Sequence, residues 1–417
     1  MRVKSNQLCN IAFFLILLDV ISASLDTFII RYAFLPVYLG VAILLFLNLR
    51  KKKAKALKLS TYSVFLVIIA LILLGAVRGG GLTEKSQLYI IILLSFILAR
   101  HEKSVDEFVV KLFLYSSLIF AVATIWLSQD RNAYIQHIVP LYPHMTNRLV
   151  NWYNEGLNAG LTGHYSTNGM ILANGMLIAG TAVLTFDDKK TKLKWYILSA
   201  IFVIALFLTG KRAHLLFCFV AIFMAYIVWK GKSSFSNHIV QALGFVLLAG
   251  IIIYIAYLVN PVVAQVLNRF QNMGEDQNIT SRYMFWELAW SNFIQHPFWG
   301  IGWGNFYNLS GSYFNYFAQV HNVYLQILCE NGILVFVLLI GWFARNIYNA
   351  IRKSRKFSLV NMENTNCSWL SLFAVAYQVY FLLYCITGNP LYDTYTYVLY
   401  FTTVIIASRP FAKDMMF

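Results

Sequence analysis

Charged residues are scarce in this chain of 417 residues: Asp, Glu, Lys and Arg make up 12%, against 59% for apolar residues. The apolar residues come in long runs separated by short basic clusters, as in a polytopic membrane protein. The alternation of apolar and polar residues over about 10 positions that a membrane β-barrel needs is lacking. Because each backbone amide in hydrocarbon must bond within the protein, runs of about 20 apolar residues predict spanning helices.

These apolar runs predict about twelve transmembrane helices, so both termini should lie on the same side of the membrane. The expected spans are residues 8–24, 29–49, 61–77, 88–99, 108–127, 166–186, 195–209, 213–229, 239–259, 321–343, 368–387 and 394–408. The fold class is therefore all-α and polytopic, and residues 1–417 should form a single integral membrane domain.

Acidic residues are scarcer than basic ones, at 17 against 33, which gives a formal charge of +16. Under the predicted topology most Lys and Arg fall in cytoplasmic segments, among them the run at 50–53, as the positive-inside rule requires. The external segments keep only Arg78, Lys85, Arg131, Arg148, Lys211, Arg212, Arg269 and Arg282. We therefore expect cytoplasmic termini and a basic collar that contacts membrane lipids. Nucleic acid is not expected as a partner, since no soluble basic domain exists.

Cysteines are few, and their spacing does not fit a metal site. Cys9, Cys218, Cys329, Cys367 and Cys385 fall in apolar segments or on the predicted cytoplasmic side, so we expect free thiols. No Asp-x-Asp pair, which could supply oxygen ligands to a metal ion, occurs in the external loops. The sequence therefore predicts neither a metal nor another cofactor.

Two external segments, 128–165 and 260–320, are long enough to form a site, and function in a membrane scaffold concentrates in such loops. In the first segment aromatic residues stand close to Asn and Gly and lead to His164, Tyr165 and Asn168 at the mouth of the sixth helix. This composition suits stacking on sugar rings, and it also suits an interfacial aromatic belt. The residues alone leave both interpretations open.

The second segment predicts an amphipathic helix from about Thr280 to Gln295, because Thr280 or Ser281 can cap its start and Pro297 ends it. Trp286 begins an apolar face that could rest on the membrane surface. Arg282 lies one turn before Trp286, and surface anchoring is its simplest role.

Lys211 and Arg212 interrupt the apolar stretch 195–229, which is too long for one helix and predicts two helices joined by a tight external turn. The two cations could simply extend to the outer surface. However, an arginine at membrane depth usually has a partner. Arg212 could hold a phosphate with two N–H groups, which Lys211 does less well.

His321 and Asn322 stand where a polar loop rich in Tyr, Asn and Gly meets an apolar helix. A neutral histidine there could be only a hydrogen-bonded helix cap, since imidazole serves many roles. It could instead act as a general base toward a sugar hydroxyl. Glu330 lies about 13 Å further along the helix at 1.5 Å per residue, too far to pair with His321. We therefore favour a structural role for Glu330.

Several segments of the chain resemble the bacterial O-antigen ligase and Wzy-type polysaccharide polymerase superfamily. They are GHYSTNG at 163–169, TGKRA at 209–213, Arg282 with Trp286, HPFWGIG at 296–302, HNVYLQ at 321–326 and ENG at 330–332. The resemblance covers roughly residues 160–345, which we expect to be the catalytic core. Each piece alone is weak, and their order and combination make the resemblance fairly specific.

The resemblance implies a glycosyltransferase of the C type that acts outside a bacterial cytoplasmic membrane. Its implied donor is an undecaprenyl-diphosphate-linked oligosaccharide, used without a nucleotide sugar or an essential metal. Arg212 and Arg282 match the family's arginines and are expected to stabilise the departing diphosphate, and His321 matches the histidine expected to activate the acceptor hydroxyl. The residues expected to bind substrate are Lys211, His164, Tyr165, Asn168, Asn322, Tyr324 and Trp286.

Within the superfamily, the strings at 211–214 and 164–168 favour a repeat-unit polymerase for capsule, exopolysaccharide or O-antigen, acting with inversion. An O-antigen ligase that transfers polymer to the lipid A core is the alternative. A transporter or flippase for the same lipid-linked sugars is another, although such proteins place polar groups near mid-membrane. A chain-length regulator and a flippase are candidate protein partners.

Overall fold

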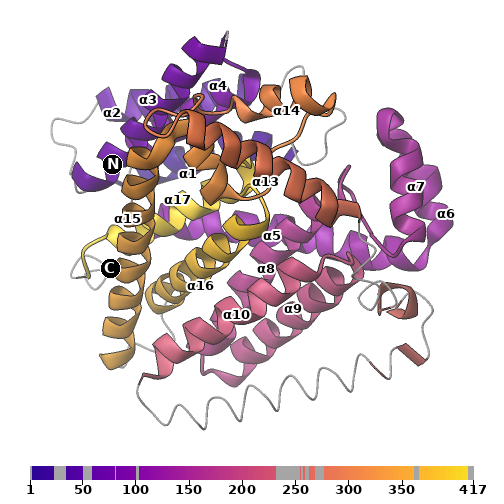
Figure 1. Cartoon of the computed structure of the whole chain (residues 1–417). Coiled ribbons are helices and arrows are strands. Elements are labelled where there is room, and N and C mark those ends of the chain that lie inside the picture. Colours follow the sequence, from indigo (N-terminus) through magenta and orange to yellow (C-terminus); the bar gives the residue numbers. More distant parts are fainter. Residues whose placement is uncertain are drawn as a thin grey trace.

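The computed structural model describes residues 2–22, 34–49, 59–79, 81–99, 103–231, 254, 257–258, 263–267, 277–360 and 366–411. Within these ranges the regular structure is helical and contains no strand, which confirms the all-α prediction (Figure 1). The helices are α1 (Arg2–Ser22), α2 (Phe34–Leu49), α3 (Leu59–Gly79), α4 (Glu84–Leu98), α5 (Lys103–Gln129), α6 (Arg131–Ala133), α7 (Thr146–Asn154), α8 (Tyr165–Thr185), α9 (Lys189–Leu208), α10 (Arg212–Lys230), α13 (Gln277–Gln295), α14 (Phe306–Phe314), α15 (Val323–Leu359), α16 (Asn366–Thr387) and α17 (Thr394–Ser408). A π-helical turn (Tyr134–Ile138) and two 3-10 turns (Val139–Leu141 and Pro143–Met145) connect α6 to α7.

Among the described residues, six helices are long and apolar enough to cross a membrane: α5, α8, α9, α10, α15 and α16. Shorter apolar segments lie in α1, α2, α3 and α17. Each expected span coincides with one of these helices or with α4, except 239–259, which falls outside the described residues apart from three single positions. The chain is thus a polytopic membrane protein, and the count of twelve spans remains a prediction.

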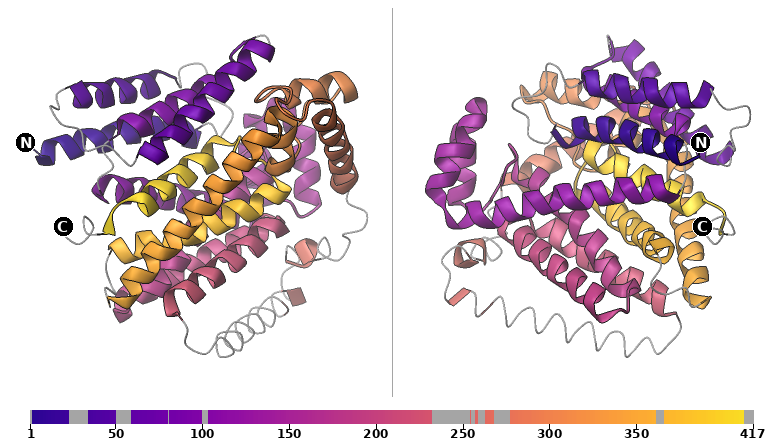
Figure 2. Two further views of the ribbon diagram at one scale, coloured as in Figure 1. Left: turned by 60° about the vertical axis from the view of Figure 1, so that its left-hand side comes forward. Right: turned by 180° about the vertical axis from the view of Figure 1, so that it is seen from behind.

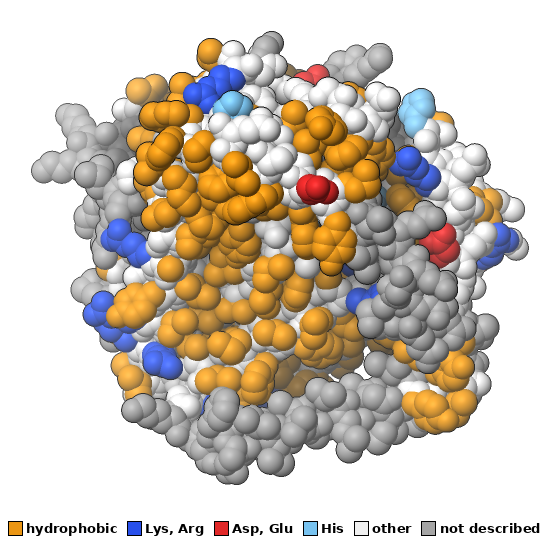
Figure 3. Space-filling model, in the orientation of Figure 1, with side chains coloured by type: hydrophobic (Ala, Val, Ile, Leu, Met, Phe, Trp, Pro, Cys, Tyr) orange, Lys and Arg blue, Asp and Glu red, His pale blue; other side chains and the backbone are white. Residues whose placement is uncertain are grey.

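Large apolar side chains stay exposed on the spanning helices, as a bilayer environment requires. Ile119 of α5 is 64% exposed and Leu216 of α10 is 59% exposed. Figure 3 shows such side chains covering much of one face of the molecule. A soluble monomer rarely leaves so wide an apolar surface in water, whereas lipid tails cover it without cost.

The C-terminal helices lie between two other groups of helices. In Figure 2, α15, α16 and α17 stand between α1–α4 on one side and α8–α10 on the other. Helices α8 and α16 pack against each other, and most of their side chains are buried. Small residues permit such close packing between spanning helices. At Gly175 of α8, a Cβ atom would lie only 2.3 Å from the ring of Phe202 on α9.

Helix α15 is longer than the sequence predicted. The expected span ended at residue 343, before a basic stretch assigned to a cytoplasmic segment, whereas the helix continues to Leu359. Hydropathy falls after 343, yet one side of the helix still packs inward, with Asn346, Ala350 and Phe357 buried. A helix end judged by mean hydropathy is misplaced when the helix continues with one buried and one basic face.

A break at Gly332 divides α15. Gly332 has φ 77°, and a Cβ atom there would lie 2.3 Å from the carbonyl oxygen of Phe298. The loop at 297–302 fills the gap, and its hydrogen bonds are Ile301 N–H to Cys329 O at 3.0 Å, Gly302 N–H to Glu330 O at 2.7 Å, and Ile333 N–H to Pro297 O at 2.8 Å. Since these bonds satisfy backbone groups that the break leaves open, irregular backbone is tolerated inside a spanning helix.

The two segments predicted as external loops form short helices with small cores of their own. Helices α6 and α7 pack around Tyr134 and Leu149. Helices α13 and α14 pack around Phe285 and Phe306. The amphipathic helix expected from about 280 to 295 is confirmed as α13.

Candidate active site

Three helices begin near one another, and their first turns carry most of the expected site residues. His164 precedes α8, Lys211 precedes α10, and His321 lies two residues before α15. The positive charge of Lys211 disfavours protonation of both His164 and His321, which places the three side chains within electrostatic range. A helix N-terminus carries partial positive charge, so this cluster favours an anion.

His321 adopts a left-handed backbone conformation, with φ 58°. A non-glycine residue held there costs on the order of 1 kcal/mol and persists only where its surroundings fix it. Hydrogen bonds fix the residues that precede His321. Ser310 Oγ accepts from the N–H of Ala318 at 3.0 Å and donates to its carbonyl at 2.9 Å. Trp286 Nε1 donates to the carbonyl of Val320 at 3.0 Å, so α13 holds the turn that presents His321.

The imidazole of His321 is mostly buried and lies beside Asn389 and two cations. Asn389 Nδ2 is 3.2 Å from His321 Nδ1. Burial, followed by the charges of Arg282 and Lys211, lowers the pKa of His321 to about 4. The ring is therefore neutral near pH 7 and carries one nitrogen that can accept a proton.

His164 caps α8 with its own side chain. Its Nδ1 accepts from the N–H of Ser166 at 3.0 Å, so the neutral ring carries its proton on Nε2. The ring stacks on Tyr165 at 4.6 Å between centroids. Burial, then Lys211, His321 and Arg148, lowers the pKa of His164 to about 3. His164 therefore has an Nε2–H donor that the capping of α8 does not use.

Lys211 and Arg212 follow a tight turn at Thr209 and Gly210, as the sequence predicted. Thr209 Oγ1 accepts from the N–H of Lys211 at 3.2 Å. Both cations are half-buried, and the ammonium of Lys211 lies 5.3 Å from the centroid of the Tyr165 ring. The face of an aromatic ring attracts a cation, so Tyr165 orients Lys211. Arg212 is the first residue of α10.

Arg282 reaches the cluster from α13, which packs against α15. Its side chain is half-buried. The described ion pairs are Lys111 with Glu107, Lys192 with Asp187, and Arg409 with Asp106, and none of them uses Arg282. The charge of Arg282 acts on His321 and on the hydroxyl of Tyr384.

Three residues expected to bind substrate have structural bonds that occupy their side chains. Asn168 is fully buried, and its Nδ2 donates to Thr124 Oγ1 at 2.9 Å. Asn322 Oδ1 caps α15 by accepting from Leu325 N–H at 3.1 Å. The Tyr324 hydroxyl donates to the carbonyl of Leu382 at 2.8 Å. In this structure these side chains hold the helices whose ends form the cluster.

Glu330 has the structural role that we favoured from sequence. The carboxylate is fully buried. Its four donors are the N–H groups of Gly304 (2.9 Å) and Phe306 (3.2 Å), Gln326 Nε2 (3.0 Å) and the hydroxyl of Tyr392 (2.7 Å). Glu330 therefore ties the glycine-rich loop before α14 to the broken part of α15 and to the turn before α17.

The sequence reasoning missed two residues of the cluster. Asn389 lies in the turn between α16 and α17, which was dismissed as a short external connection. Arg148 on α7 was counted only as an external cation, yet its charge acts on His164. The sequence Gly388-Asn389-Pro390 is a turn signal at the expected external face, and it could have directed attention there.

Residues 197–340 match a protein family described as O-antigen ligase. The matched region contains Lys211, Arg212, Arg282 and His321, whereas His164 and Asn389 lie outside it. No curated protein matches the chain.

Proposed function

The chain belongs to the O-antigen ligase superfamily, and from that premise we propose that this membrane enzyme transfers glycan from a lipid-linked diphosphate donor to a sugar hydroxyl. The proposed donor is an undecaprenyl-diphosphate-linked oligosaccharide in a bacterial inner membrane. The site would face the extracytoplasmic side, with both termini in the cytoplasm. The observation that carries the proposal is the position of His164, Lys211 and His321 at the starts of α8, α10 and α15, with Arg282 within electrostatic range of His321.

The cations and helix ends suit a departing diphosphate. Lys211 and Arg212 stand at the positive end of α10, and Arg282 comes from α13. Negative charge develops on the diphosphate oxygens as the bond to the sugar breaks. Preorganised positive groups stabilise such charge strongly where water is scarce. Arg212 and Arg282 are the proposed catalytic cations, with Lys211 assisting, and no nucleotide sugar or metal is required.

His321 is the proposed general base. For its Nε2 to accept a proton, Nδ1 must carry the ring hydrogen, and Asn389 must present Oδ1 to it. A half-turn of the Asn389 amide does this. Among the described residues Oδ1 of Asn389 accepts no hydrogen bond, so the half-turn leaves no acceptor bond behind. Asn389 is thus a positioning residue that sets the tautomer of His321.

The proposed reaction is a single displacement. The acceptor hydroxyl oxygen attacks the anomeric carbon, and its proton passes to Nε2 of His321. The bond between the anomeric carbon and the phosphate oxygen breaks, and its electron pair leaves with the polyprenyl diphosphate. Attack opposite the leaving group inverts the anomeric configuration. The Nε2–H of His164 would donate to a substrate oxygen, since its Nδ1 is engaged in capping α8.

We propose a repeat-unit polymerase for capsule, exopolysaccharide or O-antigen, with the O-antigen ligase as the alternative. The two share the donor and the leaving group and differ in the acceptor. Deletion of a polymerase should leave single repeats on the lipid carrier, whereas deletion of a ligase should leave long polymer that is not attached to lipid A core. Gel analysis of the lipid-linked glycans separates the two outcomes.

Transport of the same lipid-linked sugars is a second candidate, because a broken spanning helix is common at transporter binding sites. The break at Gly332 could be read that way. However, the loop at 297–302 already bonds the backbone groups on both sides of the break. A transporter would need those groups for its ligand, so we favour transfer.

The direct test incubates the purified full-length protein with a lipid-linked repeat unit. Transfer should yield a ladder of glycans on a gel, together with released polyprenyl diphosphate. Arg131→Gln serves as a control, since Arg131 lies on α6 and bonds Asn154. Absence of a ladder and of released diphosphate with correctly folded native protein would contradict the proposal.

A further inference from the structure

A basic pocket lies at the far end of α15 from His321. It has a volume of about 280 Å³ and is formed by α15 and the end of α17. Its basic lining residues are Arg345, Arg352, Lys353, Lys356 and Arg409. Among the described residues that line the pocket, none is acidic. From Ile333, just after the break, to Arg352 the helix rises roughly 28 Å at 1.5 Å per residue. This is close to the thickness of the hydrocarbon core of a bilayer, which supports a place for the pocket at the opposite interface from His321.

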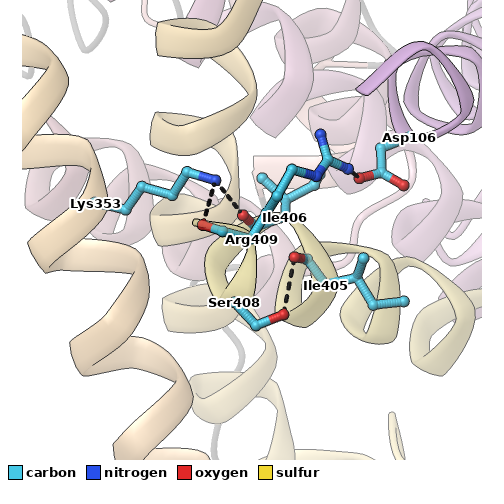
Figure 4. A network of polar contacts seen from close by, with 6 residues as sticks. All are labelled: Asp106, Lys353, Ile405, Ile406, Ser408 and Arg409. Carbon is cyan, nitrogen blue, oxygen red and sulfur yellow. Dashed lines mark hydrogen bonds and ion pairs between the residues drawn. The ribbon is translucent and has the colours of Figure 1, made fainter. Parts of the chain in front are cut away.

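The base of this pocket is built into the fold (Figure 4). Lys353 is only 7% exposed, and its ammonium donates to the carbonyls of Ile406 at 2.7 Å and Arg409 at 3.2 Å. These bonds satisfy carbonyls at the end of α17. Arg409 forms an ion pair with Asp106 of α5. The pocket thus joins three helices.

The rim of the pocket is exposed and basic. Arg345 and Arg352 are seven residues apart on α15, two turns on the same face, and both are exposed. Lys356 is exposed one turn further on. Figure 3 shows Lys and Arg side chains along the left edge of the molecule, over the C-terminal half of α15. Their positive field points out of the pocket, where an anion can reach it.

The same face of α15 becomes apolar toward mid-membrane. Leu338 is seven residues before Arg345 and is 49% exposed, and Leu334, one turn earlier, is 61% exposed. The exposed leucines therefore run directly into the exposed arginines along roughly 16 Å of helix from Leu334 to Arg345. A free phosphate would use only the basic part. A molecule with an anionic head and apolar chains would use the whole face.

We propose that this face binds an anionic phospholipid, with its phosphate between Arg345 and Arg352 and its acyl chains along Leu334 and Leu338. Basic pockets between spanning helices are suited to such head groups, and each cation near the surface strengthens binding. Buried Lys353 holds the end of α17 against α15 at the base of this pocket. The lipid would bridge α15 and the end of α17 at the opposite interface from His321.

The test uses full-length protein in detergent and detects intact protein–lipid complexes by native mass spectrometry. Phosphatidylglycerol is the anionic probe, phosphatidylcholine the zwitterionic one, and sodium pyrophosphate the water-soluble one. Phosphatidylglycerol should bind more tightly than phosphatidylcholine. Arg345→Gln and Arg352→Gln should each weaken phosphatidylglycerol binding roughly 5-fold, the equivalent of one surface cation.

Arg355→Gln is the matched control. Arg355 is exposed on the same turn of α15 but does not line the pocket, so its variant should bind phosphatidylglycerol as the native protein does. The proposal is overturned if Arg345→Gln and Arg352→Gln bind like native protein, or if Arg355→Gln loses as much. It is also overturned if pyrophosphate displaces phosphatidylglycerol at equal concentration, since the site would then recognise phosphate alone. A single elution peak on size exclusion confirms that each variant is folded.

Discussion

The two ends of α15 both gather positive charge, and they use it differently. Near His321, Lys211 and Arg282 act on a neutral imidazole beside the N-termini of three helices. At the other end, Arg409 pairs with Asp106, and Lys353 bonds the last carbonyls of α17. Part of the charge there stabilises the fold, and the exposed part forms the proposed lipid site.

This difference indicates why only the first end suits catalysis. A buried histidine beside cations resists protonation, and its pKa of about 4 makes it a weak base in the free protein. In the proposed reaction a bound diphosphate offsets those cations. The pKa of His321 then rises toward its usual range, and the base becomes stronger once the donor is in place. The second end has no titrating group of this kind in its described lining.

The largest expected effect comes from His321→Asn. Asparagine tolerates the left-handed backbone of this position, so the turn should fold while the proton acceptor is lost. Transfer should fall roughly 10²- to 10⁴-fold, the usual contribution of a general base. The rate of polyprenyl diphosphate release measures it. His137→Asn, at an exposed position of the first loop, should retain the native rate.

Arg212→Gln and Arg282→Gln should each lower the rate of transfer roughly 10²- to 10³-fold, as does loss of one group that stabilises a transition-state charge. Membrane insertion and detergent solubility should be unchanged. Native chain lengths in cells that carry Arg212→Gln would count against a role in catalysis.

Glu330→Ala should lower the free energy of unfolding rather than act directly on the rate of transfer. Removal of this buried carboxylate leaves donors from Gly304, Phe306 and Tyr392 without an acceptor, at a cost of roughly 2–4 kcal/mol in the free energy of unfolding. Thermal unfolding in detergent measures the loss. Glu287→Ala on α13 is the control, and an equal loss there would mean that the contacts of Glu330 matter little.

Asn389→Asp should move the pH profile without abolishing transfer. The free enzyme needs neutral His321, so its kcat/KM should decline as the pH falls through about 4. A carboxylate next to Nδ1 favours the imidazolium and raises its pKa, so the acid limb should move to higher pH. An unchanged acid limb in the variant would mean that residue 389 does not influence the pKa of His321.

The smallest effect is expected from Arg352→Gln. This residue lies in the pocket at the other end of α15, so the rate of transfer in detergent should stay within about 2-fold of the native rate, the size of a remote surface change. A loss of rate as large as that of Arg282→Gln would mean that the pocket at the far end of α15 also affects transfer at His321.

Most helix positions could be predicted from the sequence, because long apolar runs mark the segments that lie in the membrane. The turn before Arg212, helix α13 and the structural role of Glu330 were predicted, and residues 197–340 match the family that the sequence motifs resemble. The end of α15 was missed because its last turns are basic outside and buried inside.

Pairings across the chain could not be predicted. Nothing local connects Asn389 with His321, 68 residues away, or Trp286 with the carbonyl of Val320. Composition also cannot distinguish an amide that meets a ligand from one that bonds a neighbouring helix. Asn168 illustrates this, since its bond to Thr124 depends on how α8 packs on α5.

The most direct measurement is single-turnover release of polyprenyl diphosphate from a lipid-linked repeat unit by purified native, Arg282→Gln and Arg131→Gln proteins. Release by native and Arg131→Gln proteins at equal rates, with at least roughly 100-fold slower release by Arg282→Gln, is the predicted result. Equal rates for all three proteins would contradict the view that the cations around His321 hold the leaving group.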